Sequence, residues 1–328
     1  MRDPAFWWRD NSLVGALLSP LGAAYGAVVA RRMAAPGTRA NVPVICVGNF
    51  TLGGAGKTPT VIWLAKMLQA AGARPFCLSR GYGGSLAGPH QVDVKTDSAA
   101  LVGDEALLLA RIAPMVIAHD RLAGARMAQS AGAKVVIMDD GLQNASLAKD
   151  FTIAVVDGRR GIGNACVFPA GPLRAPLKVQ IAQTDALLTI GGEAAGVVAV
   201  APGLPVFHGR LVPDVPAVAA LKALKVLAFA GIGDPDKFFM TLAEAGIAVA
   251  QHRAFADHHR YTAGEAAALI AEAERGGLVL LTTEKDHARM AGDPALAPLR
   301  SRAQVLPVTL VVDETEELRT LVLAKARR

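Results

Sequence analysis

The sequence predicts an α/β protein with a parallel sheet, a second and smaller α/β unit, and an apolar helix near the N-terminus. Short apolar runs without polar alternation recur along the chain, starting at residues 44–47, and they are typical of parallel strands covered on both faces. A glycine-rich loop joins this first run to a helix with apolar periodicity that begins near Pro59. After residue 225, strands and helices alternate again in a βαβαβ-like order, which indicates the second unit.

Length and composition fit a soluble protein with more than one domain. The chain has 328 residues, and 52% of them are hydrophobic, which is enough for a sizeable core. We expect an apolar helix within residues 1–35, a first α/β domain over 36–200 and a second over 201–328. The cysteines Cys46, Cys77 and Cys166 are far apart, so they indicate neither a zinc site nor a disulfide framework, and a reducing cytosol is expected.

The charge balance indicates an anionic partner. The formal net charge is +6 and the isoelectric point is about 9.4. The basic residues are scattered and form no run with interleaved aromatics, so the sequence argues against nucleic-acid binding. Phosphate groups or anionic lipids are the expected partners.

The N-terminal segment has a membrane-related pattern. Residues 13–30 are apolar or small, Phe6, Trp7 and Trp8 precede them, and two arginines follow at 31 and 32. The stretch approaches the length of a membrane span, but Pro20 and its glycines argue against one, and no clear signal-peptide pattern is present. A helix that lies in the membrane interface fits better, and a helix packed on its own domain is the alternative.

Residues 51–58 form a candidate phosphate-binding loop between the first strand and the helix that follows. Glycines let successive backbone N–H groups converge on phosphate oxygens at the positive end of a helix, Lys57 adds a positive charge, and the Thr58 hydroxyl can reach Mg²⁺. The usual spacing has a glycine at the position of Thr51, so Gly53 and Gly54 are expected to supply the tight turn, unless the glycine-rich segment is a chance connection. The expected nucleotide-binding residues are Thr51, Leu52, Gly53, Gly54, Ala55, Gly56, Lys57 and Thr58.

Two segments in the first domain carry further candidate side chains. A strand over 74–79 leads into a glycine-rich loop with Arg80 and Tyr82, which is either a substrate contact at the end of a strand or an ordinary turn. Asp104 and Glu105 begin a helix over 106–112, where an acid commonly caps the helix or complements its dipole. A catalytic role for Asp104 is the other possibility.

Asp139 and Asp140 directly follow a predicted buried strand at 134–138. Two adjacent acids at a strand end are costly unless a cation compensates them, and in phosphate-loop enzymes an acid at this place holds Mg²⁺. We therefore expect a magnesium site here, with a chance turn as the alternative.

Cationic side chains lie in two further loops. Arg121 follows a short strand at 116–118 and suits either a phosphate or a surface ion pair. Arg174 lies between prolines in the long loop over 157–178, where it can act as a fixed anion clamp. Residues 191–209 are rich in Gly, Ala, Val and Pro, and this composition is typical of a domain linker.

The remaining elements are expected from apolar runs. His258 and His259 lie in a loop of the second unit and are either metal ligands or solvated histidines. No glycine-rich dinucleotide fingerprint with a downstream acid accompanies this unit, which argues against a nicotinamide site. The remaining expected strands are 151–156, 186–190, 225–230, 249–250, 278–281 and 304–312, and the remaining helices are 237–245 and 263–274.

Eight motifs occur in the order VGNFTLGGAGKTP, SRGYGG, GDE, DDGLQ, GPLR, AGIGDPDKFF, FADHHRYT and TTEKD. In this combination the chain resembles the tetraacyldisaccharide 4′-kinases of lipid A biosynthesis, and the resemblance extends to about Asp286. It implies a P-loop NTPase-like first domain and transfer of the ATP γ-phosphoryl to the 4′-hydroxyl of a membrane-embedded, tetraacylated glucosamine disaccharide 1-phosphate. It also implies a location at the cytoplasmic face of the inner membrane.

The resemblance implies roles for individual residues. Lys57 matches the phosphate lysine, Thr58, Asp139 and Asp140 match the magnesium ligands, and Asp104 matches the general base, with His258 as the histidine that pairs with it. Because Asp104 and His258 lie in different expected domains, the pair is expected to assemble when the domains approach each other. The remaining implied residues are the phosphate-holding or charge-neutralising Arg121 and Arg174 and the substrate contacts Arg80, Tyr82, Glu105 and Gln143.

The chain departs from the family pattern at two residues, and two rival functions are open. The family pattern usually has His after DDGLQ and Glu after GPLR, where this chain has Asn144 and Ala175. One rival is a membrane-docked ATPase switch; a GTPase is disfavoured because residues 283–286 do not match the guanine-reading motif. The other rival is a kinase of a small metabolite.

Overall fold

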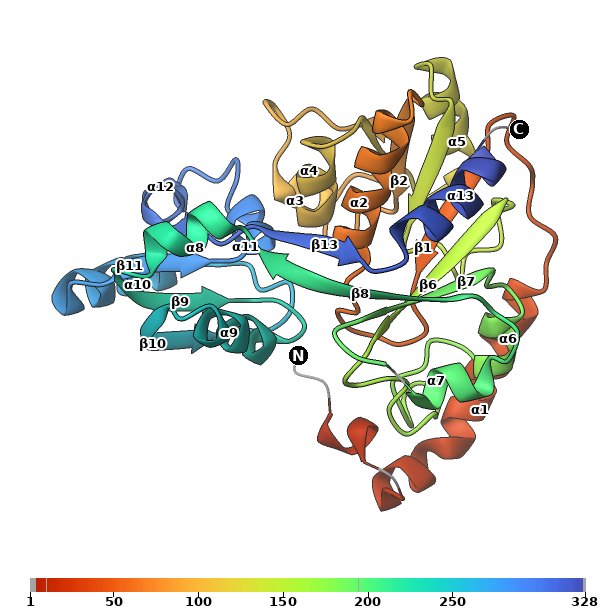
Figure 1. Ribbon diagram of the computed structural model, residues 1–328, viewed down its shortest axis with the longest axis horizontal. Coiled ribbons are helices and arrows are strands. Elements are labelled where there is room, and N and C mark those ends of the chain that lie inside the picture. The colour runs from red at the N-terminus through yellow and green to blue at the C-terminus, as the bar shows by residue number, and fades with distance from the viewer. Residues whose placement is uncertain (1–3, 10, 194, 327–328) are drawn as a thin grey trace.

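A larger, mostly parallel sheet and a smaller parallel sheet organise the molecule. The computed structural model describes residues 4–9, 11–193 and 195–326. The larger sheet has nine strands in the order β13-β8-β7-β6-β1-β5-β2-β4-β3, and the smaller has four in the order β10-β9-β11-β12. Figure 1 shows the smaller sheet beside the larger one, with β8 and β13 running between the two parts. The fold class expected from the apolar runs is confirmed.

The central strands of the larger sheet carry only buried side chains, because helices cover both faces of the sheet. Helices α2, α4 and α13 pack on one face, and α5, α6 and α7 pack on the other. All strand pairs are parallel except β3 with β4 and β8 with β13. The strands are β1 (Val44–Gly48), β2 (Pro75–Ser79), β3 (His90–Gln91), β4 (Met115–Ile117), β5 (Val135–Asp139), β6 (Phe151–Asp157), β7 (Ala186–Ile190), β8 (Val206–Pro213) and β13 (Val308–Val312).

Two helices of this domain, over residues 57–70 and 104–110, were expected from the sequence, whereas its other helices were not. The helices are α2 (Lys57–Ala70), α3 (Ala99–Val102), α4 (Asp104–Ala110), α5 (Arg121–Ser130), α6 (Leu177–Ile181), α7 (Ala195–Val200) and α13 (Thr315–Ala326). Helix α5 begins at an N-cap formed by Asp120, whose side chain accepts hydrogen bonds from two backbone N–H groups.

The smaller domain is an all-parallel α/β unit, as the alternating order of elements predicts. Leu227 and Phe229 of its central strand are fully buried against α10 and α12. Its elements are α8 (Val215–Leu221), β9 (Lys225–Ala230), α9 (Pro235–Glu244), β10 (Ala248–Ala254), α10 (Ala263–Gly276), β11 (Val279–Thr282), α11 (Glu284–Arg289), α12 (Ala297–Arg302) and β12 (Gln304–Val305).

Two expectations about the second half of the chain were wrong. Residues 191–209 are not a linker, because they contain α7 and the start of β8, which pairs with β7 in the larger sheet. Residues 304–312 are not one strand: β12 belongs to the smaller sheet and β13 to the larger, and Pro307, which has no backbone N–H, lies between them. The division between the sheets therefore does not fall at residue 200, since β8, β13 and α13 belong with the first domain.

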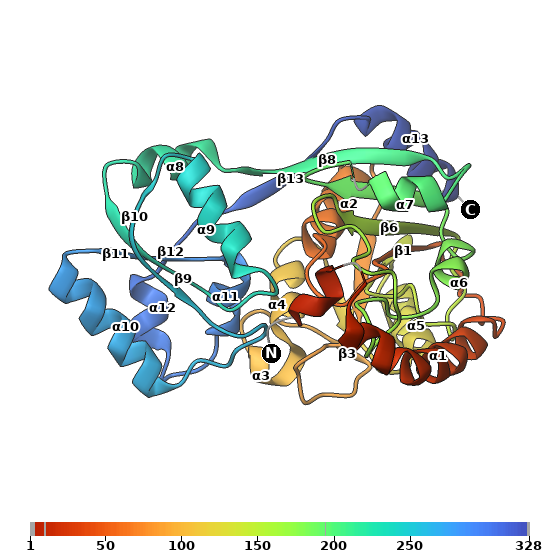
Figure 2. The ribbon, with the colours of Figure 1, turned by 90° about the horizontal axis from the view of Figure 1, so that it is seen from below.

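The N-terminal helix lies along the surface of the larger domain. A short 3₁₀ helix, η1 (Ala5–Trp8), precedes α1 (Leu13–Met33), whose N-cap is Ser12. One side of α1 packs through glycines on the loop before α6, whereas Leu13, Leu17 and Leu21 are 87%, 81% and 61% exposed. Among the described residues, α1 alone is long and apolar enough to cross a membrane. Figure 2 shows α1 along one edge of the molecule.

Candidate active site

The candidate phosphate-binding segment, residues 51–58, has the backbone of a tight, glycine-dependent turn. Gly53 and Gly56 both have φ of +97°, a conformation that glycine adopts without strain, and Gly56 directly precedes α2. Thr51 instead forms an antiparallel bridge with Leu173. This chain therefore needs no glycine at residue 51, because the turn is made further along the segment.

The side chain of Asn49 hydrogen-bonds this segment, and sequence reasoning did not single it out. The side chain is fully buried, and its Nδ2 donates to the carbonyl of Thr51 at 2.7 Å. Its Oδ1 accepts a hydrogen bond from Nζ of Lys57 at 3.0 Å. The VGN letters of the first motif were the available signal, since a buried amide directly after a strand must find partners.

The two acids after β5 differ in their surroundings. Asp139 is 1% exposed, its Oδ1 has no hydrogen-bond partner, and burial, together with Glu105 and Asp140, raises its pKa to about 7. Asp140 has φ of +53° and lies 3.5 Å from Nζ of Lys57 and 2.9 Å from Nη1 of Arg174. Burial acts to raise the pKa of Asp140, but the two cations outweigh it and hold that pKa below its usual range.

Helix α4 brings Asp104 and Glu105 between the two domains. Gly103 precedes them with φ of +92°, and a Cβ at that residue would lie 2.5 Å from the carbonyl of Tyr82, so glycine is required there. Oδ2 of Asp104 lies 3.4 Å from Nδ1 of His258 and accepts hydrogen bonds from Arg289. The predicted pair is thus already together in this structure, without any further approach of the domains.

The charges around Asp104 explain its ionisation. Burial acts to raise the pKa of Asp104, but His258, Arg289 and Lys285 outweigh it and hold that pKa far below its usual range. The hydrogen bond that His258 donates to Asp104 raises the pKa of His258, against the opposing effect of burial. Each charged side chain therefore stabilises the charged form of the other.

Glu105 connects the small domain to the phosphate-binding segment. Its Oε1 lies 2.5 Å from Nζ of Lys285 and accepts a 3.4 Å hydrogen bond from the hydroxyl of Thr58. Burial opposes ionisation, but Lys285 and Lys57 outweigh it and lower the pKa of Glu105. Lys285 and Arg289 were not identified from the sequence, although Lys285 belongs to the TTEKD motif, because nothing in a linear pattern shows which acid a distant cation will face.

The other predicted residues surround this centre at different distances. Arg174 also donates from Nε to the carbonyl of Thr51 at 2.9 Å, so the GPLR loop runs beside the phosphate-binding segment. Arg121 is 5% exposed, its buried Nε has no partner, and burial together with Arg80 lowers its pKa. Tyr82 is 66% exposed, and its ring lies edge-on to His258 with centroids 5.0 Å apart.

Two residues have their polar groups committed to the protein. The Nε2 of Gln143 donates to the carbonyl of Asn49 at 2.9 Å and to Oε1 of Gln180 at 2.7 Å. His259 contacts Glu265 at 3.0 Å, and within the described chain no group of three or more His, Cys, Asp or Glu side chains is arranged to hold a metal. The metal-ligand alternative for the two histidines therefore has no support.

A cavity of about 280 Å³ lies between the domains and reaches the Asp104–His258 pair. Its wall includes Gly83 of the SRGYGG loop and Arg260, whose Nη2 donates to the carbonyl of Gly83 across the interface at 2.5 Å. Charged side chains of both domains and apolar ones such as Leu296 line it, so the cavity suits a ligand that has both polar and apolar parts.

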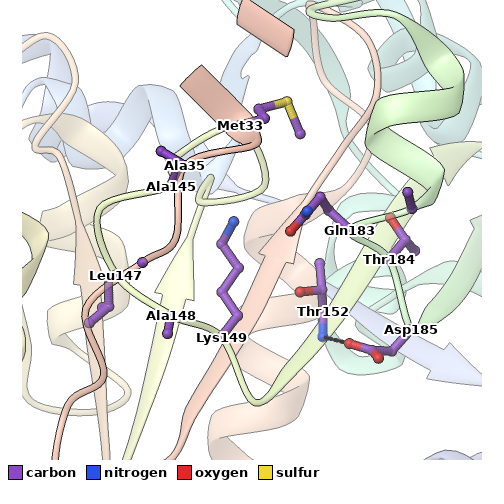
Figure 3. A pocket seen from close by; sticks show the side chains of 12 residues that line it. Met33, Ala35, Ala145, Leu147, Ala148, Lys149, Thr152, Gln183, Thr184 and Asp185 are labelled. Carbon is purple, nitrogen blue, oxygen red and sulfur yellow. Dashed lines mark hydrogen bonds between the residues drawn. The ribbon is translucent and has the colours of Figure 1, made fainter. Parts of the chain in front are cut away.

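A second hollow, of about 230 Å³, lies at the opposite end of the larger sheet, where β6 begins (Figure 3). Met33 at the end of α1, Lys149 and Gln183 are among its lining residues. Lys149 donates to the carbonyl of Leu142 at 2.9 Å. Since β1 and β6 are parallel, the hollow is remote from the phosphate-binding segment that follows β1, and it contains none of the predicted site residues.

Comparison with known proteins agrees with this arrangement of motifs. A family model described as "Tetraacyldisaccharide-1-P 4'-kinase" matches residues 14–327. The tetraacyldisaccharide 4′-kinase of Rhodopseudomonas palustris (strain BisB5) is 54% identical over 99% of this chain and 97% of its own length. That of Methylobacterium sp. (strain 4-46) is 57% identical over 94% of each chain.

A solved structure shares the whole fold. The crystal structure of LpxK from Aquifex aeolicus, described as an "apo" form in complex with ATP, matches with a TM-score of 0.74 and 28% identity. The match covers 95% of this chain and 99% of that one. This chain therefore belongs to the tetraacyldisaccharide 4′-kinase family of lipid A biosynthesis.

Proposed function

We propose that this chain carries out its family's reaction at the junction of its two domains, with Asp104 as the general base. ATP is bound at residues 51–58, and its γ-phosphoryl passes to the 4′-hydroxyl of a tetraacylated glucosamine disaccharide 1-phosphate. The products are ADP and the 1,4′-bisphosphorylated glycolipid.

The observation that carries this proposal is the short path of contacts from the phosphate-binding segment to the paired acid. The hydroxyl of Thr58 donates to Glu105, and the residue directly before Glu105 is Asp104. His258 of the other domain lies 3.4 Å from the carboxylate of Asp104. A carboxylate this close to a triphosphate site can accept the proton of an attacking hydroxyl.

In this mechanism Asp104 binds the 4′-hydroxyl and takes its proton as the oxygen attacks phosphorus. The carboxylate is ready for that task because its low pKa keeps it ionised at neutral pH. His258 donates to the carboxylate and keeps it oriented. Lys57 leaves Asp140 and Asn49 to reach the phosphates, where the backbone N–H groups of the glycine turn also bind.

The residues present fit a magnesium ion. Asp139 is a buried carboxylate whose Oδ1 has no partner, which is costly unless a cation is bound nearby, and carboxylate and hydroxyl oxygens are the ligands that Mg²⁺ prefers. Thr58, Asp139 and Asp140 would hold the ion. When bound, Mg²⁺ neutralises charge on the phosphate oxygens.

Cationic side chains around the junction suit the charged substrates. Arg121 has a buried guanidinium nitrogen without a partner, and Arg80 lies near it, so both are available to an anionic group. Arg174 can exchange Asp140 for a phosphate oxygen during transfer. Tyr82 stands exposed beside His258, where it can contact the acceptor sugar.

The exposed face of α1 suits the acyl chains and the membrane surface. Its apolar side chains face outward, Arg31 and Arg32 lie in its last turn, and its inner face is held by the protein. A helix with these features lies in the interface of a bilayer. The enzyme would then work at the cytoplasmic face of the inner membrane, where its glycolipid substrate is embedded.

The test is incubation with labelled ATP, Mg²⁺ and a tetraacylated disaccharide 1-phosphate in detergent. We expect label in a bisphosphorylated lipid and little ATP hydrolysis without the acceptor. Rapid hydrolysis without lipid would favour an ATPase switch, and transfer to a water-soluble metabolite would favour a small-molecule kinase. Either result, with no lipid product, contradicts the proposal.

A further inference from the structure

We propose that Arg289 is a positioning residue for the transfer step: from the smaller domain it fixes the orientation of the Asp104 carboxylate. This inference rests on the proposed role of Asp104 as general base. Arg289 lies at the end of α11, and the GDE motif that contains Asp104 lies on α4 of the larger domain.

The contact between the two side chains is direct and shielded from water. Nε of Arg289 donates to Oδ2 of Asp104 at 2.9 Å, and Nη2 donates to the same oxygen at 2.6 Å. The side chains are 6% and 5% exposed. Charge-assisted hydrogen bonds in such an environment are strong and directional.

Arg289 is itself held in place by a buried carboxylate. Its Nη1 donates to Oδ1 of Asp286 at 2.6 Å and to the carbonyl of Gly231 at 2.9 Å. Asp286 is fully buried, and it accepts hydrogen bonds from the hydroxyls of Tyr261 at 3.0 Å and Thr283 at 2.7 Å. The planar guanidinium therefore bridges two acids and has little freedom to rotate.

The distribution of partners distinguishes the two oxygens of Asp104. Arg289 and His258 both approach Oδ2, whereas Oδ1 accepts one 3.0 Å hydrogen bond, from the backbone N–H of Glu105. Oδ1 thus keeps a lone pair that no described residue uses. We assign Oδ1 as the oxygen that accepts the proton of the substrate hydroxyl.

Joining the domains does not require Arg289. Other contacts cross the same interface: Lys285 with Glu105 at 2.5 Å, Lys237 with Asp157 at 3.3 Å and Arg260 with the carbonyl of Gly83 at 2.5 Å. Loss of the Arg289 contact should therefore leave the domains together but release the carboxylate of Asp104. This separates a positioning role from a merely structural one.

The test compares four variants of the full-length enzyme with the wild type. Arg289→Met removes the guanidinium at similar length, and Arg289→Lys keeps a charge that cannot bridge both acids. Tyr261→Phe removes the hydrogen bond to Asp286. Arg302→Met is the control, because Arg302 belongs to the same domain and forms an exposed pair with Glu274. Each is assayed for kcat, for KM of ATP and acceptor, for thermal unfolding and for the pH dependence of kcat.

We expect Arg289→Met to lower kcat by about 100-fold, since small misplacements of a catalytic group cost about that much, with both KM values within about threefold. Arg289→Lys recovers part of the loss, and Tyr261→Phe shows a smaller loss. The groups facing Asp104 are Glu105, His258, Lys285 and Arg289. Removing Arg289 raises the pKa of Asp104, so the acidic limb of the kcat profile moves to higher pH.

Several results would overturn the inference. One is wild-type kcat in Arg289→Met; another is a loss confined to KM or to thermal stability, with an unshifted pH profile. If Arg289→Met does not fold, an unchanged kcat and profile in Tyr261→Phe overturns it. Failure of the proposed function is distinguishable, because full transfer by Asp104→Ala would remove the base assignment whatever Arg289 does.

Discussion

Nη1 of Arg174 lies 2.9 Å from both carboxylate oxygens of Asp140, and Nζ of Lys57 lies 3.5 Å from the same carboxylate. Asp140 thus holds two cations that we propose to bind phosphates. Asp140 keeps the side chains of Arg174 and Lys57 in position before nucleotide binds. Each of the two then exchanges the carboxylate of Asp140 for a phosphate oxygen.

Arg174→Gln should lower kcat by roughly 10²- to 10³-fold, because a guanidinium directed at developing phosphoryl charge is lost. The free energy of unfolding should change by less than about 1 kcal/mol, since the pair is partly exposed. Arg210→Gln, in an exposed pair with Asp313 far from the site, is the matched control. Equal activity of Arg174→Gln and the control would exclude Arg174 from the transfer step.

The His258–Asp104 pair should make stability depend on pH. The folded-state pKa of His258 is raised above its unfolded value, so the stabilisation is fully present below the unfolded pKa and is lost as pH rises through the folded pKa. The facing acids are Asp104, Asp257 and Glu105. Thermal unfolding of the wild type and His258→Asn should therefore differ most near pH 6 and converge at higher pH. A difference that grows with pH would contradict the pairing.

Charge on the exposed face of α1 should weaken membrane binding without affecting the fold. Leu17→Glu with Leu21→Glu places two carboxylates on the outward side of the helix, where burial in the lipid interface would be unfavourable. The fraction of the double variant that sediments with anionic vesicles should be several-fold lower than that of the wild type. The unfolding temperature should not change. Val215→Glu, also at an exposed apolar residue, serves as control. Unchanged vesicle binding by the double variant would count against the interface helix.

The glycine face of α1 should not tolerate a methyl group. A Cβ at Gly22 would lie 2.7 Å from the carbonyl of Val167, so Gly22→Ala should destabilise the protein by about 1–3 kcal/mol despite the better helix propensity of alanine. Gly264→Ala in α10 is the control, because nothing lies within 4 Å of its Cβ position. Denaturant unfolding measures the free energy of unfolding of both variants. Equal stability of the two variants would mean that α1 does not pack as described.

The strand, loop and helix around residues 44–70 could be predicted because each part has a local cause. Apolar runs make buried strands, positive φ requires glycine at residues 53 and 56, and apolar periodicity marks the helix. The strands at 186–190 and 225–230 were likewise predicted with their observed bounds, because their apolar runs are short and sharply ended.

What could not be predicted depends on contacts between distant segments. Nothing local shows that β12 and β13, separated by two residues, belong to different sheets. Arg289 looks like any arginine at the end of a helix, where it complements the dipole. Its role arises only because α11 packs against α4 and brings it to an acid 185 residues away in the chain. Lys285 escaped notice for the same reason, since the acid that it faces, Glu105, is 180 residues away in the chain.

Single-turnover transfer by Asp104→Ala tests whether Asp104 accepts the proton of the acceptor hydroxyl beside bound ATP. We expect this variant to bind ATP with near wild-type affinity and to unfold cooperatively. It should transfer label to the tetraacylated disaccharide 1-phosphate at least about 100-fold more slowly than the wild type. A transfer rate within a few-fold of the wild type at saturating ATP and lipid would contradict it.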